Sequence, residues 1–191
     1  MTESSTPRRS SVPGLKWVDH VAFTVPDLDD ATRLFIDLFG AEELYRATRG
    51  PDASFMPEHF GVPEDAHLEL RMLRLPPNLN VELFQWWSTD RTPTFPRMSD
   101  AGGHHLCFVV DDVDDVVDAL KRHSDLRILG SRKEVNGDSP VAGNRWIYAQ
   151  TTWGLVLEFV DRSRVVDPPR LVGPHDWRNT AAGPTISEEP T

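Results

Sequence analysis

The stretch DHVAFTVPDLDDA, residues 19 to 31, decides the fold, because a similar stretch, HHLCFVVDDVDDV, occurs again at residues 104 to 116. At a shift of 85 positions the two stretches share six identities in thirteen, among them His20 with His105 and Asp27 with Asp112. Such a match is the signature of an internal repeat, in which each copy is one structural unit. The sequence therefore predicts two tandem modules.

Each copy opens with the same succession of local signals. VAFTV and LCFVV are rich in β-branched and aromatic residues, which favour strands. The aspartates that follow are typical helix N-caps, and Gly40 is placed to end the first helix. Later strands are expected at 43 to 46, 67 to 75 and 80 to 86, and in the second copy at 127 to 129, 145 to 150 and 155 to 160. Both copies read βαβββ.

These elements predict an α+β fold in which two tandem βαβββ modules form a half-open eight-stranded barrel around a metal site, with the helices outside. The first module is assigned to residues 15–87, an inter-module linker to 88–103 and the second module to 104–161. Residues 1–14 and 162–191 lack periodicity and are interpreted as tails, the C-terminal one mostly flexible. Three long irregular stretches are expected to rim a cavity: 47 to 66, 87 to 103 and 131 to 144.

Composition excludes several classes of protein. The formal net charge of -10 and the dispersed basic residues argue against a nucleic-acid partner. The single cysteine, Cys107, cannot form an internal disulfide. We find neither a continuous apolar run long enough for a membrane span nor the apolar core of a signal peptide, so the expected location is cytoplasmic.

Strand alternation selects the candidate metal ligands. Apolar residues such as Val21 and Phe23 form the helix-facing side of the first strand, which turns His20 toward the barrel interior. The same reasoning turns His105, Glu82 and Glu158 inward. Two imidazoles and two carboxylates at matching repeat positions suit one divalent ion such as Zn, Ni, Co, Mn or Fe(II).

Other side chains are candidates for contact with substrate or with the metal ligands. His67, Glu69 and Arg71 share one strand face, and Tyr148 and Gln150 share another. An exposed sheet face with alternating charge gives the same pattern, so a structural role is the competing interpretation. His104 is turned away by alternation, whereas Cys107 is expected to face the cavity.

The openings DHVAFTVPDLDDA and GGHHLCFVVDDVDDV, with NVELFQ and GLVLEFVD closing the modules, resemble the vicinal oxygen chelate superfamily of glyoxalases, bleomycin-resistance proteins and dioxygenases. The stretch GGHHLCFVVDD is especially similar to methylmalonyl-CoA epimerases, and epimerases of cyclitol-type keto sugars belong to the same superfamily. The resemblance places metal ligands at His20, Glu82, His105 and Glu158, and it gives Glu158 and Glu82 the role of moving the proton.

The resemblance implies a metal-dependent isomerase or epimerase that acts on a small carbonyl compound through a metal-stabilised enolate. A glyoxalase-I-like lyase is the first alternative, because glyoxalase I also has a glutamate at the place of Glu82. An extradiol-type dioxygenase and a non-catalytic small-molecule binding protein are further alternatives, although ligands in both modules argue against each. Superfamily members of this size commonly pair, so we expect a homodimer.

Overall fold

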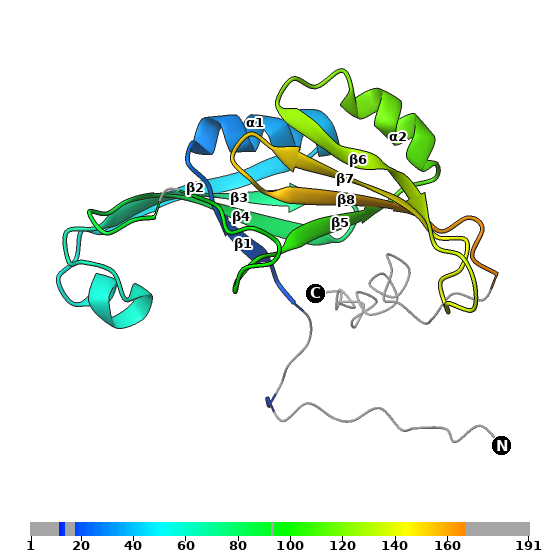
Figure 1. The fold of residues 1–191 in the computed structure, drawn as a ribbon. Helices are drawn as coiled ribbons and strands as arrows, with labels where there is room; N and C mark the ends of the chain where they lie inside the picture. The colour runs from blue at the N-terminus through cyan, green and yellow to red at the C-terminus, as the bar shows by residue number, and fades with distance from the viewer. Residues whose placement is uncertain (1–11, 14–17, 93, 167–191) are drawn as a thin grey trace, which may run out of the picture.

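The computed structural model describes residues 12, 13, 18–92 and 94–166, and within them the two modules follow one another as the repeat predicts (Figure 1). The first module contains β1 Val21–Thr24, α1 Leu28–Phe39, β2 Glu42–Arg49, the π-helical turn η1 Met56–Phe60, β3 His67–Leu75 and β4 Leu79–Trp87. The second contains β5 His105–Val109, α2 Val113–Leu120, β6 Leu126–Glu134, β7 Arg145–Thr151 and β8 Val156–Asp161. The predicted α+β class and the βαβββ order are confirmed, while the predicted tails fall almost wholly outside the described residues.

The eight strands are divided between two four-stranded sheets of identical topology, β1-β4-β3-β2 and β5-β8-β7-β6. In each sheet the first strand pairs in parallel with the last strand of its module, and the other pairs are antiparallel. Both helices lie on the same side of the sheets in Figure 1, which leaves the other side open. No helix in the described part of the chain is long and apolar enough to cross a membrane.

The two helices begin in the same way because the repeat supplies the same capping residue. Asp27 caps α1 by accepting a hydrogen bond from the backbone N–H of Asp30 at 2.8 Å, and Asp112 caps α2 through the N–H of Asp114 at 2.7 Å. A capping carboxylate satisfies one of the free N–H groups of the first turn and is further favoured by the helix dipole. Helix α1 ends at Gly40, whose φ of 66° lies in the left-handed region that favours glycine.

One apolar core runs through both modules and fixes their relative position. Phe35 of α1 and Leu157 of β8 are both fully buried and belong to the same cluster. Phe39, at the end of α1, stacks on Phe108 of the second module with ring centroids 4.1 Å apart. Offset aromatic pairs of this kind stabilise a contact beyond the area that they bury. The seam between the modules is therefore a packed interface rather than a loose junction.

The structure differs from the sequence prediction in the two outer strands. Strands β2 and β6 both extend beyond the predicted 43 to 46 and 127 to 129. They lie at sheet edges, where much of their surface is exposed, so apolar alternation is weak. In β6 a register shift after Leu129 coincides with Gly130, whose φ is 73°.

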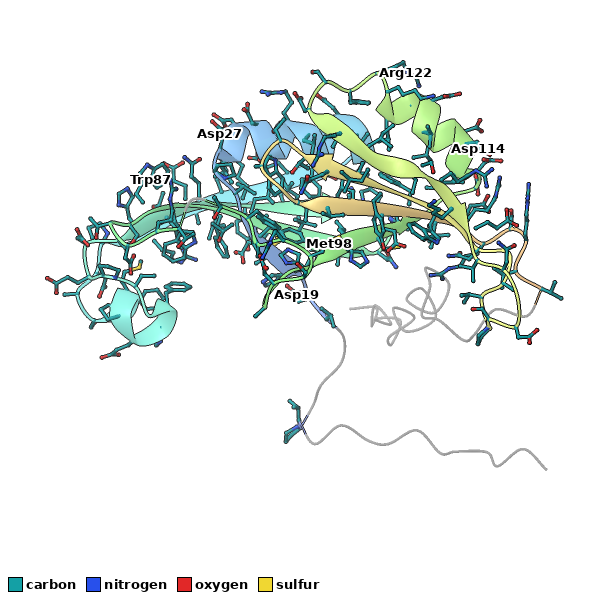
Figure 2. The ribbon with its side chains drawn as sticks, viewed as in Figure 1. Asp19, Asp27, Trp87, Met98, Asp114 and Arg122 are labelled. Atoms are coloured by element: carbon teal, nitrogen blue, oxygen red, sulfur yellow. The ribbon has the colours of Figure 1, made fainter. Side chains whose placement is uncertain are left out.

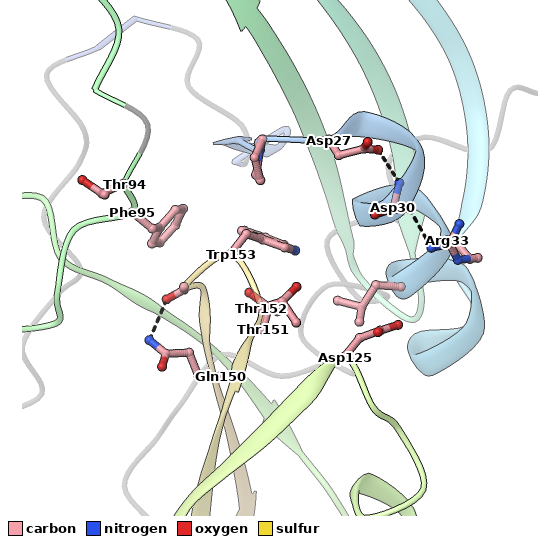
Figure 3. Close-up of a pocket in the computed structure, with 13 residues that line it drawn as sticks. Asp27, Asp30, Arg33, Thr94, Phe95, Asp125, Gln150, Thr151, Thr152 and Trp153 are labelled. Atoms are coloured by element: carbon pink, nitrogen blue, oxygen red, sulfur yellow. Dashed lines mark hydrogen bonds and ion pairs between the residues drawn. The ribbon is translucent and has the colours of Figure 1, made fainter.

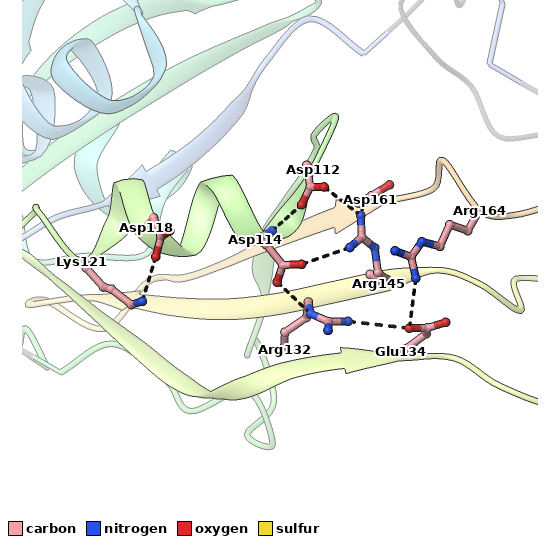
Figure 4. A network of polar contacts seen from close by, with 9 residues as sticks. All are labelled: Asp112, Asp114, Asp118, Lys121, Arg132, Glu134, Arg145, Asp161 and Arg164. Carbon is pink, nitrogen blue, oxygen red and sulfur yellow. Dashed lines mark hydrogen bonds and ion pairs between the residues drawn. The ribbon is translucent and has the colours of Figure 1, made fainter.

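A buried cation stabilises the second module (Figure 4). The guanidinium of Arg145 is ion-paired with the fully buried carboxylate of Asp161 and with Asp112 and Asp114 at the start of α2. Burial opposes ionisation of Asp161, but the hydrogen bonds from Ser163 and the contact with Arg145 outweigh it and lower the pKa of this carboxyl. The network joins β7, β8 and the N-terminus of α2.

We expect Asp161→Asn to lower the free energy of unfolding at pH 7 by about 2 kcal/mol, since Arg145 stays buried but loses its nearest carboxylate. Because the folded-state pKa of Asp161 lies below its unfolded value, this stabilisation is complete above about pH 4 and is lost as the pH falls further. Urea titrations of both proteins at pH 7 and pH 3 measure the difference. An equal difference at both pH values would contradict the assignment.

Candidate metal centre

A histidine and a glutamate lie side by side in each module. The Nε2 atom of His20 is 3.3 Å from a carboxylate oxygen of Glu82, and the Nε2 atom of His105 is 2.8 Å from a carboxylate oxygen of Glu158. The side chains of the two glutamates are 14% and 15% exposed. Each module thus builds the same half-buried pair, at positions related by the repeat.

Strand register brings these pairs together. Ala22 of β1 is the register partner of Glu82, and Cys107 of β5 is the register partner of Glu158. The histidine stands two residues before that partner in each case, so the imidazole and the carboxylate project from neighbouring strands on the same face. That face is opposite to the one covered by the helices, as alternation predicts.

Asp19 orients the first imidazole. The Nδ1 atom of His20 is 2.8 Å from a carboxylate oxygen of Asp19, to which it can donate. A neutral ring that donates from Nδ1 keeps a lone pair on Nε2, directed at Glu82, which is the tautomer that metal-binding histidines use. In Figure 2, Asp19 lies on the opposite side of the molecule from the labelled helix residues Asp27 and Asp114. Sequence reasoning missed Asp19, although its place beside a candidate ligand was a usable signal.

The geometry of each pair fits a divalent ion. Bonds of roughly 2.0–2.2 Å at about 90° place two ligand atoms about 3 Å apart, and the two pairs have spacings of 3.3 Å and 2.8 Å. Within the described residues, however, the structure does not gather three or more His, Cys, Asp or Glu side chains around one point. The structure therefore places one His–Glu pair in each module. We call His20 with Glu82 the first half-site and His105 with Glu158 the second. Convergence of all four side chains on one ion stays a prediction.

The predicted group of His67, Glu69 and Arg71 lies on the other face of β3. Arg71 pairs in register with the buried Leu83, and its buried side chain is ion-paired with Asp29 at the start of α1. Glu69 shares this face, and His67 stacks on Trp87 with ring centroids 5.0 Å apart. These three side chains are directed away from Glu82, so Arg71 has a structural role in the first module.

Tyr148 and Gln150 are placed differently from each other. Tyr148 is the register partner of Glu158 and contacts the ring of His105 at a centroid distance of 5.8 Å, so it belongs to the second half-site. Gln150 accepts a hydrogen bond from Arg127 at 2.6 Å and donates to the backbone oxygen of Gly154 at 3.2 Å. Its amide is thus engaged at the turn between β7 and β8.

Gln150 also lines a pocket of about 540 Å³ at the seam between the modules (Figure 3). The walls come from the start of α1, with Asp30 and Arg33, and from the turn that carries Trp153. Arg33 is already ion-paired with Asp30 at 2.7 Å. The pocket contains neither His–Glu pair.

His104 has the structural role expected from alternation. Its ring stacks on Phe23 of β1 with centroids 5.3 Å apart, and its Nδ1 atom is 2.9 Å from the backbone oxygen of Gly102. Neighbouring histidines in the sequence are therefore divided between two functions. His104 packs across the seam, and His105 faces Glu158.

Two tandem βαβββ modules, each with a His at or immediately before the start of its first strand and a Glu on its last, define a class of paired-module proteins with a candidate metal centre. A model of the glyoxalase/bleomycin resistance protein/dioxygenase superfamily matches residues 19–142. The chain belongs to this family, which is the vicinal oxygen chelate superfamily.

The chain is also similar to individual members. It is 40% identical over 150 residues to a 2-epi-5-epi-valiolone epimerase from Actinomyces sp, covering 78% of this chain and 81% of the relative. A glyoxalase family protein from Bacillus cereus shares the fold with a TM-score of 0.60 and 22% identity, over 80% of this chain and 98% of that one. The fosfomycin resistance protein of Listeria monocytogenes matches with a TM-score of 0.52 and 17% identity, over 76% and 92% of the two chains.

The single thiol of the chain reports on the second half-site. Cys107 is exposed as a residue, but partial burial of its thiol, followed by the negative charge of Glu158, raises the pKa of this thiol to about 12. We expect iodoacetamide to modify native Cys107 at pH 8 at least about tenfold more slowly than in urea-unfolded protein, because the thiolate is the nucleophile. Glu158→Gln should speed the native reaction, since it removes a charge that raises the pKa. Mass spectrometry measures both rates, and an unfolded-like native rate would contradict this environment.

Proposed function

We propose that this protein is a metal-dependent epimerase of a small ketone, which inverts a stereocentre next to a carbonyl group. One observation carries the reaction class, namely the 40% identity with a 2-epi-5-epi-valiolone epimerase. The two His–Glu pairs supply the side chains that such a reaction needs. By its relation to that epimerase, the substrate class is a cyclitol-type keto sugar.

His20, Glu82, His105 and Glu158 are the residues that would hold the metal ion. Two imidazoles and two carboxylates are suitable ligands for Zn, Ni, Co, Mn or Fe(II). When bound, the ion supplies Lewis-acid polarisation of the substrate carbonyl. The donation from His20 to Asp19 favours the ligand tautomer of this ring.

The two glutamates are the candidate proton carriers. One carboxylate takes the proton from the carbon beside the carbonyl, and the electron pair of the broken C–H bond moves to the carbonyl oxygen as the enolate forms. The other carboxylate gives a proton to the opposite face of that carbon, which inverts the stereocentre and restores the carbonyl. The location of Glu82 and Glu158 in different modules supports their access to opposite faces of one substrate.

Incubation with 2-epi-5-epi-valiolone in deuterium oxide should give the epimer with deuterium at the inverted carbon, as detected by NMR and mass spectrometry. Glu82→Gln and Glu158→Gln should each lower kcat by roughly 10²-fold or more, because each removes a group that transfers a proton. Oxygen uptake would instead indicate a dioxygenase, and turnover of a thiol adduct would indicate a lyase. Tight binding of the ketone without deuterium exchange would indicate a non-catalytic binding protein.

Metal binding has its own test. Replacement of His20, Glu82, His105 or Glu158 by Ala should weaken binding of Zn²⁺ or Co²⁺ at least about tenfold, because each substitution removes a ligand. His104→Phe is the matched control, since it keeps the ring that stacks on Phe23 and should bind the ion as the wild type does. Calorimetric titration of the full-length metal-free chain measures the affinities. Wild-type protein that binds none of the five candidate ions would contradict the proposal.

The same four variants test whether one ion uses both modules. Binding of one equivalent per chain, weakened by substitutions in either module, would support a shared centre. Two independent equivalents, each sensitive to one module only, would show that the half-sites act separately. The expected homodimer and cytoplasmic location remain predictions, and sedimentation at tens of micromolar tests the first of them.

A further inference from the structure

The carboxylate of Glu158 lies beside an imidazole and between two residues with polar side-chain groups. His105 lies 2.8 Å away through Nε2. Cys107 and Tyr148 are the residues that pair in register with Glu158 on the two neighbouring strands, and their thiol and hydroxyl groups can both donate a hydrogen bond. Two groups that can donate a hydrogen bond therefore flank this carboxylate.

Glu82 occupies the equivalent position in the first module but has different neighbours. Its register partners are Ala22 on β1 and Met72 on β3, where Glu158 has Cys107 and Tyr148. Neither the methyl group of Ala22 nor the thioether of Met72 can donate a hydrogen bond. The two glutamates are buried to the same extent, so the difference between them lies in their neighbouring side chains and not in their exposure.

Tyr148 is itself held in place. Its ring meets the ring of His105 in a T-shaped contact at 5.8 Å and that of Trp146 in a tilted contact at 5.1 Å. The phenolic hydroxyl at the tip of this ring can donate a hydrogen bond. A rigid aromatic ring with a polar tip can fix a neighbouring carboxylate at little cost in entropy.

We propose that Tyr148, assisted by Cys107, is a positioning residue that fixes the carboxylate of Glu158 beside His105. The second half-site is then the anchoring half of the metal centre, and the first half-site is the adjustable half. Glu82, whose register partners Ala22 and Met72 cannot donate, is the carboxylate free to reorient when substrate enters. This inference rests on the metal centre of the proposed function, and it assigns different tasks to two glutamates that the repeat makes equivalent.

The test is metal affinity, measured without substrate on the full-length metal-free chain with Zn²⁺ and with Co²⁺. Tyr148→Phe keeps the ring packing and removes only the hydroxyl, so we expect the fold and melting temperature to be kept and the Kd to rise about tenfold. Met72→Leu, at the equivalent position of the first module, should change the Kd less than twofold. Cys107→Ala should give a smaller rise than Tyr148→Phe, because a thiol is a weaker donor.

A double-mutant cycle distinguishes an effect that acts through Glu158 from a non-specific effect on the structure. If the hydroxyl acts through Glu158, Tyr148→Phe should cause no further loss of affinity in a Glu158→Gln background. In a Glu82→Gln background, by contrast, Tyr148→Phe should lower the metal affinity by the same factor as it does in the wild type. Additivity in both backgrounds, or a Tyr148→Phe variant that binds the ion as the wild type does, would overturn the inference.

The anchoring role of Tyr148 and the proposed epimerase reaction can fail independently. A wild-type chain that binds the ion tightly and shows the predicted cycle, yet exchanges no proton of any ketone, would support the anchoring role and overturn only the epimerase assignment. A wild-type chain that binds neither ion would overturn the anchoring role. With an active enzyme, Tyr148→Phe should lower kcat more than it raises KM, because the substrate does not need this hydroxyl for binding.

Discussion

Parallel pairing of the first strand of each module with its last strand is the constraint on which the candidate site depends. Roughly sixty residues separate His20 from Glu82 along the chain, yet the β1–β4 register places them 3.3 Å apart. A slip of one residue would turn one of the two side chains to the helix-covered face, where an unpaired charge is costly. The apolar side chains of these strands, such as Phe23 and Leu83, pack against the helices and so exclude the slipped register.

The seam between the modules is the second constraint, because it determines how far apart the two half-sites lie. It includes aromatic contacts, with Phe39 against Phe108 in one place and Phe23 against His104 in another. Packed interiors tolerate few voids, so such a seam has a small number of allowed arrangements. Whether four ligands meet one ion is therefore decided by contacts outside the half-sites.

Short-range sequence patterns predicted much of the fold, because each copy of the repeat contains a clear strand pattern and a clear helix cap. The capping aspartates, the apolar strand faces and the inward direction of His20 and His105 all follow from spacing of a few residues. Alternation was less informative on β3, where Leu70, Arg71, Met72 and Leu73 are all buried, so the polar group there was not recognised as helix-facing. The distance between the half-sites was beyond reach for a different reason, since it depends on packing between segments far apart in sequence.

The repeat explains both the strength and the limit of reasoning from symmetry. Duplicated backbone geometry gives each module one imidazole and one carboxylate in the same relative position, which is why the pairs are so alike in spacing and burial. The side chains on the strands beside each carboxylate are not duplicated, with Ala22 and Met72 in one half and Cys107 and Tyr148 in the other. An enzyme that inverts a stereocentre must treat two faces of one carbon in succession, and those faces differ because the rest of the substrate is chiral. A site with two chemically identical halves would be poorly matched to such a substrate, whereas a symmetric backbone with unequal hydrogen-bonding groups can hold one side firmly and adapt on the other.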